Sequence, residues 1–180
     1  MNIKARINSR KAVLAFIYQH CFFYELIIQE RPISEALFID YVFETDGEKF
    51  DQAKKVLTDN IKKYADEKVT EEMLSEFILD FFWDWEKIDV DYDYLFKVWL
   101  NFIKYIDEIT EKVNGYTTTF KFHDMDIIDR CLFILGYTEF KEFKTPKEIL
   151  LNEMIEISKR YSDDGSPKLL NGIMHKILSE

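Results

Sequence analysis

The chain has 180 residues, of which 47% are hydrophobic and 16% aromatic, with only 5 glycines and 3 prolines. This length fits one domain with a sizeable core, and the scarcity of glycine and proline favours long helices over many short strands and turns. The formal net charge of -10 disfavours binding to a phosphate backbone unless the cations gather in one place. They gather in the first dozen residues, which contain Lys4, Arg6, Arg10 and Lys11 and no acidic residue.

The two cysteines and the hydropathy pattern bear on where the protein works. Cys21 and Cys131 lie far apart and neither belongs to a C-x-x-C pair, so a reduced, cytoplasmic compartment is the simpler interpretation. No stretch of 18 consecutive apolar residues occurs, and polar residues interrupt the segment after Lys11. We therefore expect neither a membrane span nor a signal peptide.

Apolar residues recur three and four positions apart in one window after another, which predicts helices. The first helix is expected to begin at Asn8 or Ser9 and to end before Pro32, so that Arg6 and Arg10 precede or open it. Its predicted apolar face consists of Val13, Phe16, Ile17, His20, Cys21 and Tyr24.

Three further helices are expected over about residues 34–43, 50–64 and 70–85, the last of them capped by Thr70. Residues 74–85 form a broad apolar band. We expect this band to cover the core, and the alternative is a face for a partner or for a homodimer.

The next helix is expected to be long, from about Leu95 to Val113, and to end in a left-handed stop at Asn114-Gly115. Residues 116–122 are expected to form a connecting loop. Asp124 is then expected to cap a helix. The apolar face predicted for that helix consists of Ile128, Cys131, Leu132 and Leu135.

Two strong start signals predict the last two helices. Thr145-Pro146-Lys147-Glu148 has the form of a capping box with proline at the first helical position, and Ser166-Pro167 is a second cap followed by proline. The residues expected to be buried are Leu151, Met154, Ile155 and Ser158 in the first of these helices and Leu170, Ile173, Met174 and Ile177 in the second.

No motif for catalysis, cofactor binding or metal binding is present. His20, His123 and His175 each stand alone, without a second histidine or cysteine at metal-ligand spacing. The run of residues 89–93 begins like a calcium loop, but Tyr94 stands where a glycine is required, so we interpret the run as a solvated turn that caps a helix. We therefore expect a binding protein that is not an enzyme, with no catalytic residues, cofactor or metal.

The C-terminal half resembles the NusB family of transcription antitermination factors. The resemblance rests on Glu139 and on residues 129–135, 146–159 and, above all, 166–177, where Asn171-Gly172 is the most specific element. Residues 10–19 resemble the first helix of that family, and residues 106–109 resemble the end of its middle helix. Because a glycine inside a helix costs about 1 kcal/mol relative to alanine, we also expect a neighbouring helix to approach Gly172 closely.

The resemblance implies an all-α, NusB-like bundle of roughly seven or more helices in two packed subdomains. We place the N-terminal subdomain at about residues 1–88, including a longer middle segment 44–85, and the C-terminal subdomain at about 89–180. The implied function is to bind boxA-type single-stranded RNA together with the ribosomal protein NusE, within the RNA polymerase antitermination complex, which promotes read-through on ribosomal RNA operons.

The RNA-binding residues that the resemblance implies lie near both ends of the chain. They are Lys4, Arg6, Arg10, Lys11, Tyr18, Ser166 and Lys168. Tyr18 lies two turns past Arg10, where its ring could stack on a base.

The sequence departs from the family pattern at several of these positions. Residues 7–9 separate the two arginines, so fewer phosphates are neutralised and we expect weaker, less salt-dependent RNA binding. Leu169 replaces an aromatic residue, and Val98-Trp99 replaces a Gly-Val pair. The alternative function is a NusB-like helical adaptor that binds a protein partner and has lost RNA binding.

Overall fold

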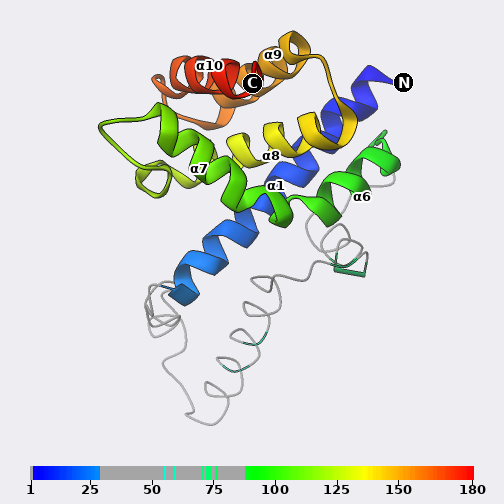
Figure 1. The fold of residues 1–180 in the computed structure, drawn as a ribbon. Helices are drawn as coiled ribbons and strands as arrows, with labels where there is room; N and C mark the ends of the chain where they lie inside the picture. Colours follow the sequence, from blue (N-terminus) through cyan, green and yellow to red (C-terminus); the bar gives the residue numbers. More distant parts are fainter. Residues whose placement is uncertain are drawn as a thin grey trace. The chain divides into compact units, whose positions relative to one another are not determined.

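The structure, a computed structural model, describes residues 2–28, 55, 59, 70, 72–73, 76 and 88–180. Within these residues it contains six α-helices, two 3-10 turns and no strand, which confirms the predicted all-α fold. The α-helices are α1 (Ile3–Ile28), α6 (Tyr92–Asn101), α7 (Ile106–Tyr116), α8 (Ile127–Phe143), α9 (Lys147–Tyr161) and α10 (Ser166–Ile177) (Figure 1). The predicted helices over 34–43 and 50–64, and most of the one over 70–85, lie outside the described residues.

The chain divides into two compact units, Met1–Tyr18 with Thr70–Glu180, and Gln19–Val69. The first unit holds the first part of α1 and all of α6 to α10. The remainder of α1 belongs to the second unit. The subdomain boundary expected near residue 88 stays a prediction. Among the described helices, none has the length and apolar character needed to cross a membrane.

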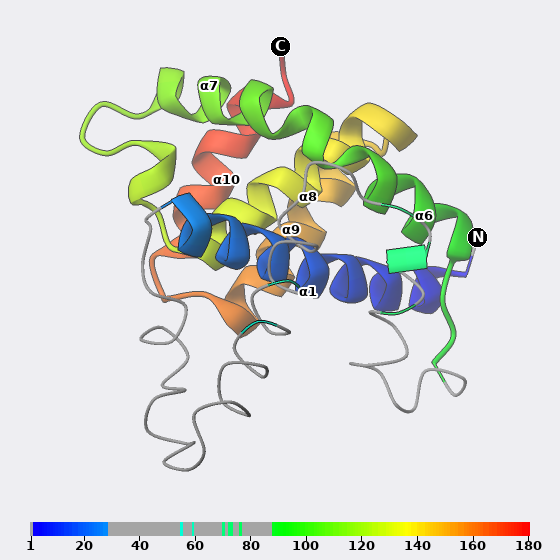
Figure 2. The same cartoon turned by 90° about the horizontal axis from the view of Figure 1, so that it is seen from below.

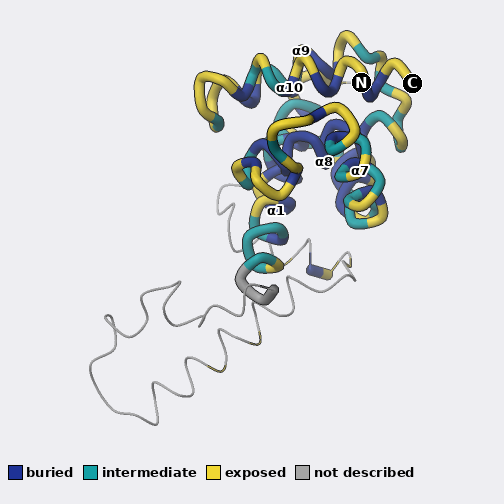
Figure 3. The backbone as a smooth tube through the Cα atoms, turned by 60° about the vertical axis from the view of Figure 1, so that its left-hand side comes forward, coloured by how far each residue is buried: buried dark blue, intermediate teal, exposed yellow. Residues whose placement is uncertain are grey.

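Helix α8 forms the centre of the first unit. Figures 1 and 2 agree in placing it between the first part of α1 on one side and α9 and α10 on the other. All residues from Asp129 to Glu139 are buried, whereas α9 and α10 expose their outer sides (Figure 3). Because α8 has neighbours on several sides, the polar side chains along it need partners inside the protein.

The prediction of one long helix over residues 95–113 is wrong. A 3-10 turn, Ile103–Tyr105, separates α6 from α7, although the segment contains no glycine or proline that would signal a break. Contacts with two other helices hold this turn. Phe102 is fully buried with its ring edge-on to Phe16 of α1, and the Tyr105 hydroxyl donates a 2.7 Å hydrogen bond to Glu142 of α8.

The first helix begins earlier than predicted. The Asn2 side-chain oxygen accepts hydrogen bonds from the backbone N–H groups of Lys4 (3.0 Å) and Ala5 (3.3 Å), so α1 starts at Ile3. Asn8 and Ser9, the predicted caps, lie inside the helix and bond instead to residues 89–91. Arg6 and Arg10 are consequently one turn apart within α1.

Three further cap predictions are wrong, because the polar side chain makes a different bond. The Thr145 hydroxyl donates to Glu139 and the Ser166 hydroxyl donates to Asp129, so neither caps its helix, although α9 and α10 begin close to the predicted positions. The Asp124 carboxylate accepts from the Lys121 N–H in the 3-10 turn Phe122–Asp124. Thr70 does act as predicted, accepting a 3.3 Å bond from the Met73 N–H.

The end of α7 also differs from the prediction. No glycine in the described residues has a positive φ, so Asn114-Gly115 is not a left-handed stop. The Asn114 side chain instead accepts a 2.7 Å bond from the Phe122 N–H across the following loop. Residues 117–121 form that loop, as predicted.

The close helix approach predicted at Gly172 is wrong. Gly172 is exposed, and a Cβ placed there would meet nothing within 4 Å. The approach occurs at Gly136, where a Cβ would lie 2.5 Å from Met174 Cε and 3.2 Å from Met154 Cγ. The predicted buried residues of α9 and α10 are confirmed except for Ile155, which is half-buried.

Candidate nucleic-acid interface

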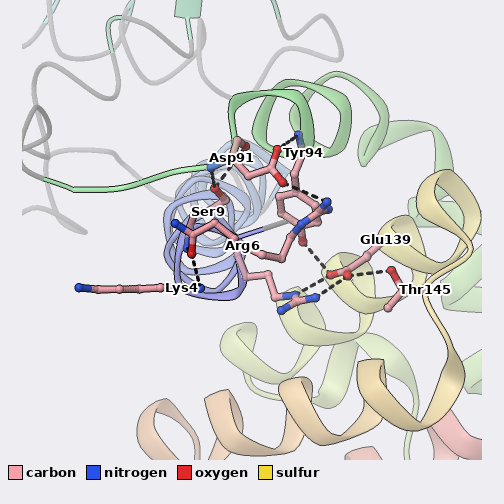
Figure 4. Close-up of polar contacts among 10 residues, drawn as sticks. Lys4, Arg6, Ser9, Asp91, Tyr94, Glu139 and Thr145 are labelled. Atoms are coloured by element: carbon pink, nitrogen blue, oxygen red, sulfur yellow. Dashed lines mark hydrogen bonds and ion pairs between the residues drawn. The ribbon is translucent and has the colours of Figure 1, made fainter.

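The first four turns of α1 carry five of the seven predicted RNA-binding residues, and helical geometry divides them between two faces. Seven residues separate Lys4 from Lys11, and seven separate Lys11 from Tyr18. Side chains seven residues apart differ in direction around the helix axis by only about 20°, so these three share one face. Lys4 is exposed, Lys11 is half-buried and Tyr18 is 41% exposed. Figure 4 shows the Lys4 side chain extending away from the neighbouring polar contacts. We call these three residues the α1 stripe.

Arg6 lies on a different face and is enclosed by α6 and α8. Its guanidinium forms a 3.0 Å ion pair with Asp91, and its side chain is only 11% exposed. The guanidinium carbon lies 4.2 Å from the centre of the Tyr94 ring and 4.7 Å from that of Phe143. Arg6 therefore lies against two neighbouring aromatic rings, whose centres are 5.2 Å apart, and such contacts stabilise a planar cation.

Arg10 is buried against two carboxylates. Its Nε and Nη2 donate hydrogen bonds of 2.8 and 2.7 Å to the two carboxylate oxygens of Glu139, and its Nη1 donates a 3.0 Å bond to Glu153. The side chains of Arg10 and Glu139 are 5% and 1% exposed. This bidentate geometry is the strongest form of an arginine–carboxylate pair.

Glu139 joins four segments of the chain. Besides the two bonds from Arg10, its carboxylate accepts hydrogen bonds from the Tyr94 hydroxyl (2.8 Å) and the Thr145 hydroxyl (3.0 Å). The carboxylate of this one α8 residue thus contacts α1, α6 and the start of α9.

The pKa values in this cluster favour a charged pair. Burial alone raises the pKa of Glu139, but the hydrogen bonds and positive charge of Arg10 outweigh it and lower that pKa below 4.5. Burial likewise opposes the charge on Arg10, and Glu139 overcomes it, so the pKa of the guanidinium is raised. Burial and the adjacent Glu139 charge raise the pKa of Tyr94 well above 10.0. The pair is therefore ionised and Tyr94 is neutral at pH 7.

Residues 89–91 are fastened to the first turns of α1. Asp89 accepts hydrogen bonds from the side chains of Asn2 and Asn8, the latter at 2.9 Å to its backbone oxygen. Ser9 exchanges two bonds with the backbone of Asp91, at 2.8 and 3.3 Å. The Asp91 carboxylate caps α6 by accepting from the Tyr94 N–H at 3.0 Å, as the helix-capping interpretation of residues 89–93 predicted.

The predicted residues near the C-terminus also differ in exposure. The Ser166 hydroxyl donates a 2.6 Å bond to Asp129 of α8, and both residues are buried. Lys168, two residues later, is exposed, and no ion pair joins it to any residue that the structure describes. Asp129 and Glu139 are ten residues apart on α8, so these two anchor points are separated by about 15 Å along the helix.

Sequence reasoning found the exposed cations but missed the carboxylates that hold Arg6, Arg10 and Ser166. One signal was available. Asp129 and Glu139 flank the apolar run from Cys131 to Leu135, which favours burial of the helix, and a buried charge requires an internal partner. In the described part of the chain, no group of histidine, cysteine, aspartate or glutamate could hold a metal ion.

The sequence model of the NusB family matches residues 8–179. The chain belongs to the NusB family. All segments that carried the resemblance in the sequence lie within the matched residues. Three of the paired residues, Arg10, Glu139 and Glu153, belong to those segments.

The NusB relatives are named transcription antitermination proteins. That of Methylacidiphilum infernorum (isolate V4) is 33% identical over 109 residues, which span 59% of this chain and 76% of the relative. That of Aliarcobacter butzleri (strain RM4018) is 30% identical over 86 residues, 48% of this chain and 66% of the relative. That of Picosynechococcus sp. is 28% identical over 71 residues, 39% of this chain and 33% of the relative.

A solved structure of T. maritima NusB superposes with a TM-score of 0.51 at 19% identity, covering 97% of this chain and 91% of that one. At this level of identity the likeness shows the fold, and it confirms the predicted NusB-like architecture. The chain is thus a member of a family of transcription antitermination factors, which is not a known enzyme family.

Proposed function

We propose that this protein is a cytoplasmic transcription antitermination factor that binds boxA-type single-stranded RNA together with NusE. In this role it joins the RNA polymerase antitermination complex and promotes read-through on ribosomal RNA operons. The observation that carries the proposal is the α1 stripe, where two lysines and a tyrosine share one face at the acid-free end of a chain with net charge -10.

The chemistry of the stripe suits a single strand of RNA. Lys4 and Lys11 supply positive charges for phosphates, and Tyr18 supplies an exposed ring on which an unpaired base can stack. Lys168, which is exposed, adds a third cation at the start of α10. Single-stranded recognition combines these same two elements, a cationic track and aromatic platforms.

The small number of cations available for phosphates supports a role for a partner. With Arg6 and Arg10 held by internal carboxylates, about three lysines remain to contact phosphates, and each phosphate contact contributes about 0.7 to the salt dependence of binding to a single strand. The protein alone should therefore bind RNA weakly. NusE, the partner that family membership suggests, would supply the additional contacts.

The proposal is tested by charge reversal on the stripe. We expect the double variant Lys4→Glu and Lys11→Glu to bind boxA-type RNA at least about tenfold more weakly, because two phosphate contacts become repulsive. Lys121→Glu combined with Lys176→Glu is the control, since it makes the same change of charge at two exposed lysines outside the stripe. Equal losses in the two double variants would contradict the proposed surface.

One observation favours the alternative function, an adaptor without RNA binding. Both arginines expected to hold phosphates are instead paired inside the protein, Arg6 with Asp91 and Arg10 with Glu139. The adaptor predicts a protein complex and no RNA binding at low salt, even with NusE present. Measurable RNA binding by the unmodified protein under those conditions excludes the adaptor.

A further inference from the structure

Helix α8 carries two buried carboxylates, and each holds a residue that the family resemblance assigns to RNA contact. Glu139 binds Arg10 of α1, and Asp129 binds Ser166 at the start of α10. We propose that Glu139 and Asp129 are positioning residues of the RNA-binding surface. They fix α1 and the start of α10 on one rigid helix, and Arg10 and Ser166 act through them without touching RNA. This inference rests on the proposed function.

Every guanidinium nitrogen of Arg10 already donates to a carboxylate inside the protein. Both nitrogens of one side of the guanidinium bind Glu139, the remaining Nη1 binds Glu153, and the side chain is 5% exposed. A phosphate would have to displace a bidentate carboxylate from a buried site. Arg10 is therefore part of the scaffold.

The Arg10–Glu139 pair determines which way the α1 stripe faces. Successive residues on a helix are turned by about 100°, so Lys11 and Arg10 point in different directions, and fixing one fixes the other. Glu139 is itself fixed by the hydroxyls of Tyr94 and Thr145. With Arg10 bound to this carboxylate, α1 cannot rotate without breaking buried bonds, and Lys4, Lys11 and Tyr18 keep their orientation.

The Asp129–Ser166 hydrogen bond fixes the start of α10, which carries Lys168, in the same way. Its 2.6 Å length and its burial tie the first residue of α10 to the first turn of α8. Lys168 follows two residues later. Because Asp129 and Glu139 belong to one continuous helix, the spacing of about 15 Å between the two anchors is set by α8 alone.

The direction in which Glu139→Gln changes RNA affinity distinguishes a positioning role from direct contact between Arg10 and RNA. If Arg10 gripped a phosphate, Glu139→Gln would release it from competition and remove a negative charge, and RNA affinity would rise. If Glu139 positions α1, the same substitution lowers RNA affinity, although the removal of a negative charge would by itself raise it. We expect affinity to fall about tenfold for Glu139→Gln and by a similar factor for Asp129→Asn, the size of coupling found between neighbouring residues.

The experiment measures the binding of boxA-type RNA by the full chain over a series of salt concentrations, at a temperature where circular dichroism shows each variant folded. Misplaced cations engage fewer phosphates, so the salt dependence of Glu139→Gln should become shallower by about 0.7 for each phosphate that is no longer bound. A variant that is merely less stable lowers the amount of folded protein and leaves that slope unchanged.

Glu142→Gln is the control, because it makes the same change on the same helix. Glu142 binds Tyr105 and Lys104 and makes no bond to α1 or α10 in the described residues. Its substitution should leave affinity unchanged or slightly higher. If Glu139→Gln does not fold, Tyr94→Phe and Ser166→Ala each remove one uncharged hydrogen-bond donor from the two anchors and should lower affinity and slope in the same direction.

The outcomes are distinct. Lower affinity with a shallower slope in Glu139→Gln and Asp129→Asn supports the positioning role. Tighter binding by Glu139→Gln, or an unchanged slope in both variants, overturns it while leaving the proposed function intact. Absence of RNA binding by the unmodified protein with NusE present contradicts the proposed function, and the positioning role with it.

Discussion

Gly136 of α8 lies in direct contact with Met174 of α10, so closely that a Cβ on the glycine would stand 2.5 Å from Met174 Cε. Met154 of α9 packs against the same point, 3.2 Å from that Cβ position. Because Gly136 has no Cβ, α9 and α10 can pack closely against α8 at this point. Gly172, which the sequence singled out for such a contact, faces open space.

We predict opposite effects for alanine at these two glycines. Gly136→Ala forces the two methionines to move and should lower the free energy of unfolding by about 1–3 kcal/mol, as other overpacked core positions do. Gly172→Ala meets no neighbour and should raise it by up to about 1 kcal/mol, because alanine favours the helix. Urea unfolding of both variants checks this, and a destabilising Gly172→Ala would show that the exposed face of α10 is wrongly described.

Acidification should weaken the fold through Glu139. Its pKa is lowered in the folded protein relative to the ordinary value of 4.5, so its stabilising contribution is complete above about that pH and is lost as the pH falls through the lower, folded value. Glu139→Gln removes the titrating group. The difference in melting temperature between the unmodified protein and Glu139→Gln should therefore be largest at neutral pH and shrink below about pH 4.5; a constant difference would contradict the ionised pair.

The Tyr94 hydroxyl should contribute to stability through Glu139. Tyr94→Phe removes one of the four hydrogen bonds to this buried, charged carboxylate and should lower the free energy of unfolding by about 1.5–3 kcal/mol. Tyr105→Phe offers a comparison, since its hydroxyl binds Glu142, whose side chain is more exposed and can bind water instead. Chemical unfolding should show the smaller effect for Tyr105→Phe, and the reverse order would contradict the central role of Glu139.

The sequence predicted most of the described helices because their periodicity is a local property. The buried positions of α10, Leu170, Ile173, Met174 and Ile177, follow directly from spacing. Helix caps were predicted poorly for a physical reason. Ser9 and Ser166 have the right chemistry to cap, but their hydroxyls bond to residues that are distant in the sequence, which a local rule does not detect. The Thr145 hydroxyl bonds to Glu139 of the preceding helix.

Part of the candidate site could likewise be predicted from local spacing, and part depends on contacts between distant residues. The seven-residue spacing of Lys4, Lys11 and Tyr18 is visible in the sequence and is enough to place them on one helix face. The burial of Arg10 is not visible there, because its partner Glu139 lies 129 residues away. Counting cations near the N-terminus therefore overestimates how many can reach a phosphate.

The measurement that tests the account most directly is the affinity for boxA-type RNA, with and without NusE, over a series of salt concentrations. Phosphate contacts by Lys4, Lys11 and Lys168 predict that the logarithm of the binding constant falls with the logarithm of salt with a slope of about -2 for the protein alone, and that NusE strengthens binding. Slopes near zero, or the absence of binding in both cases, would contradict a cationic RNA-binding surface on α1 and α10.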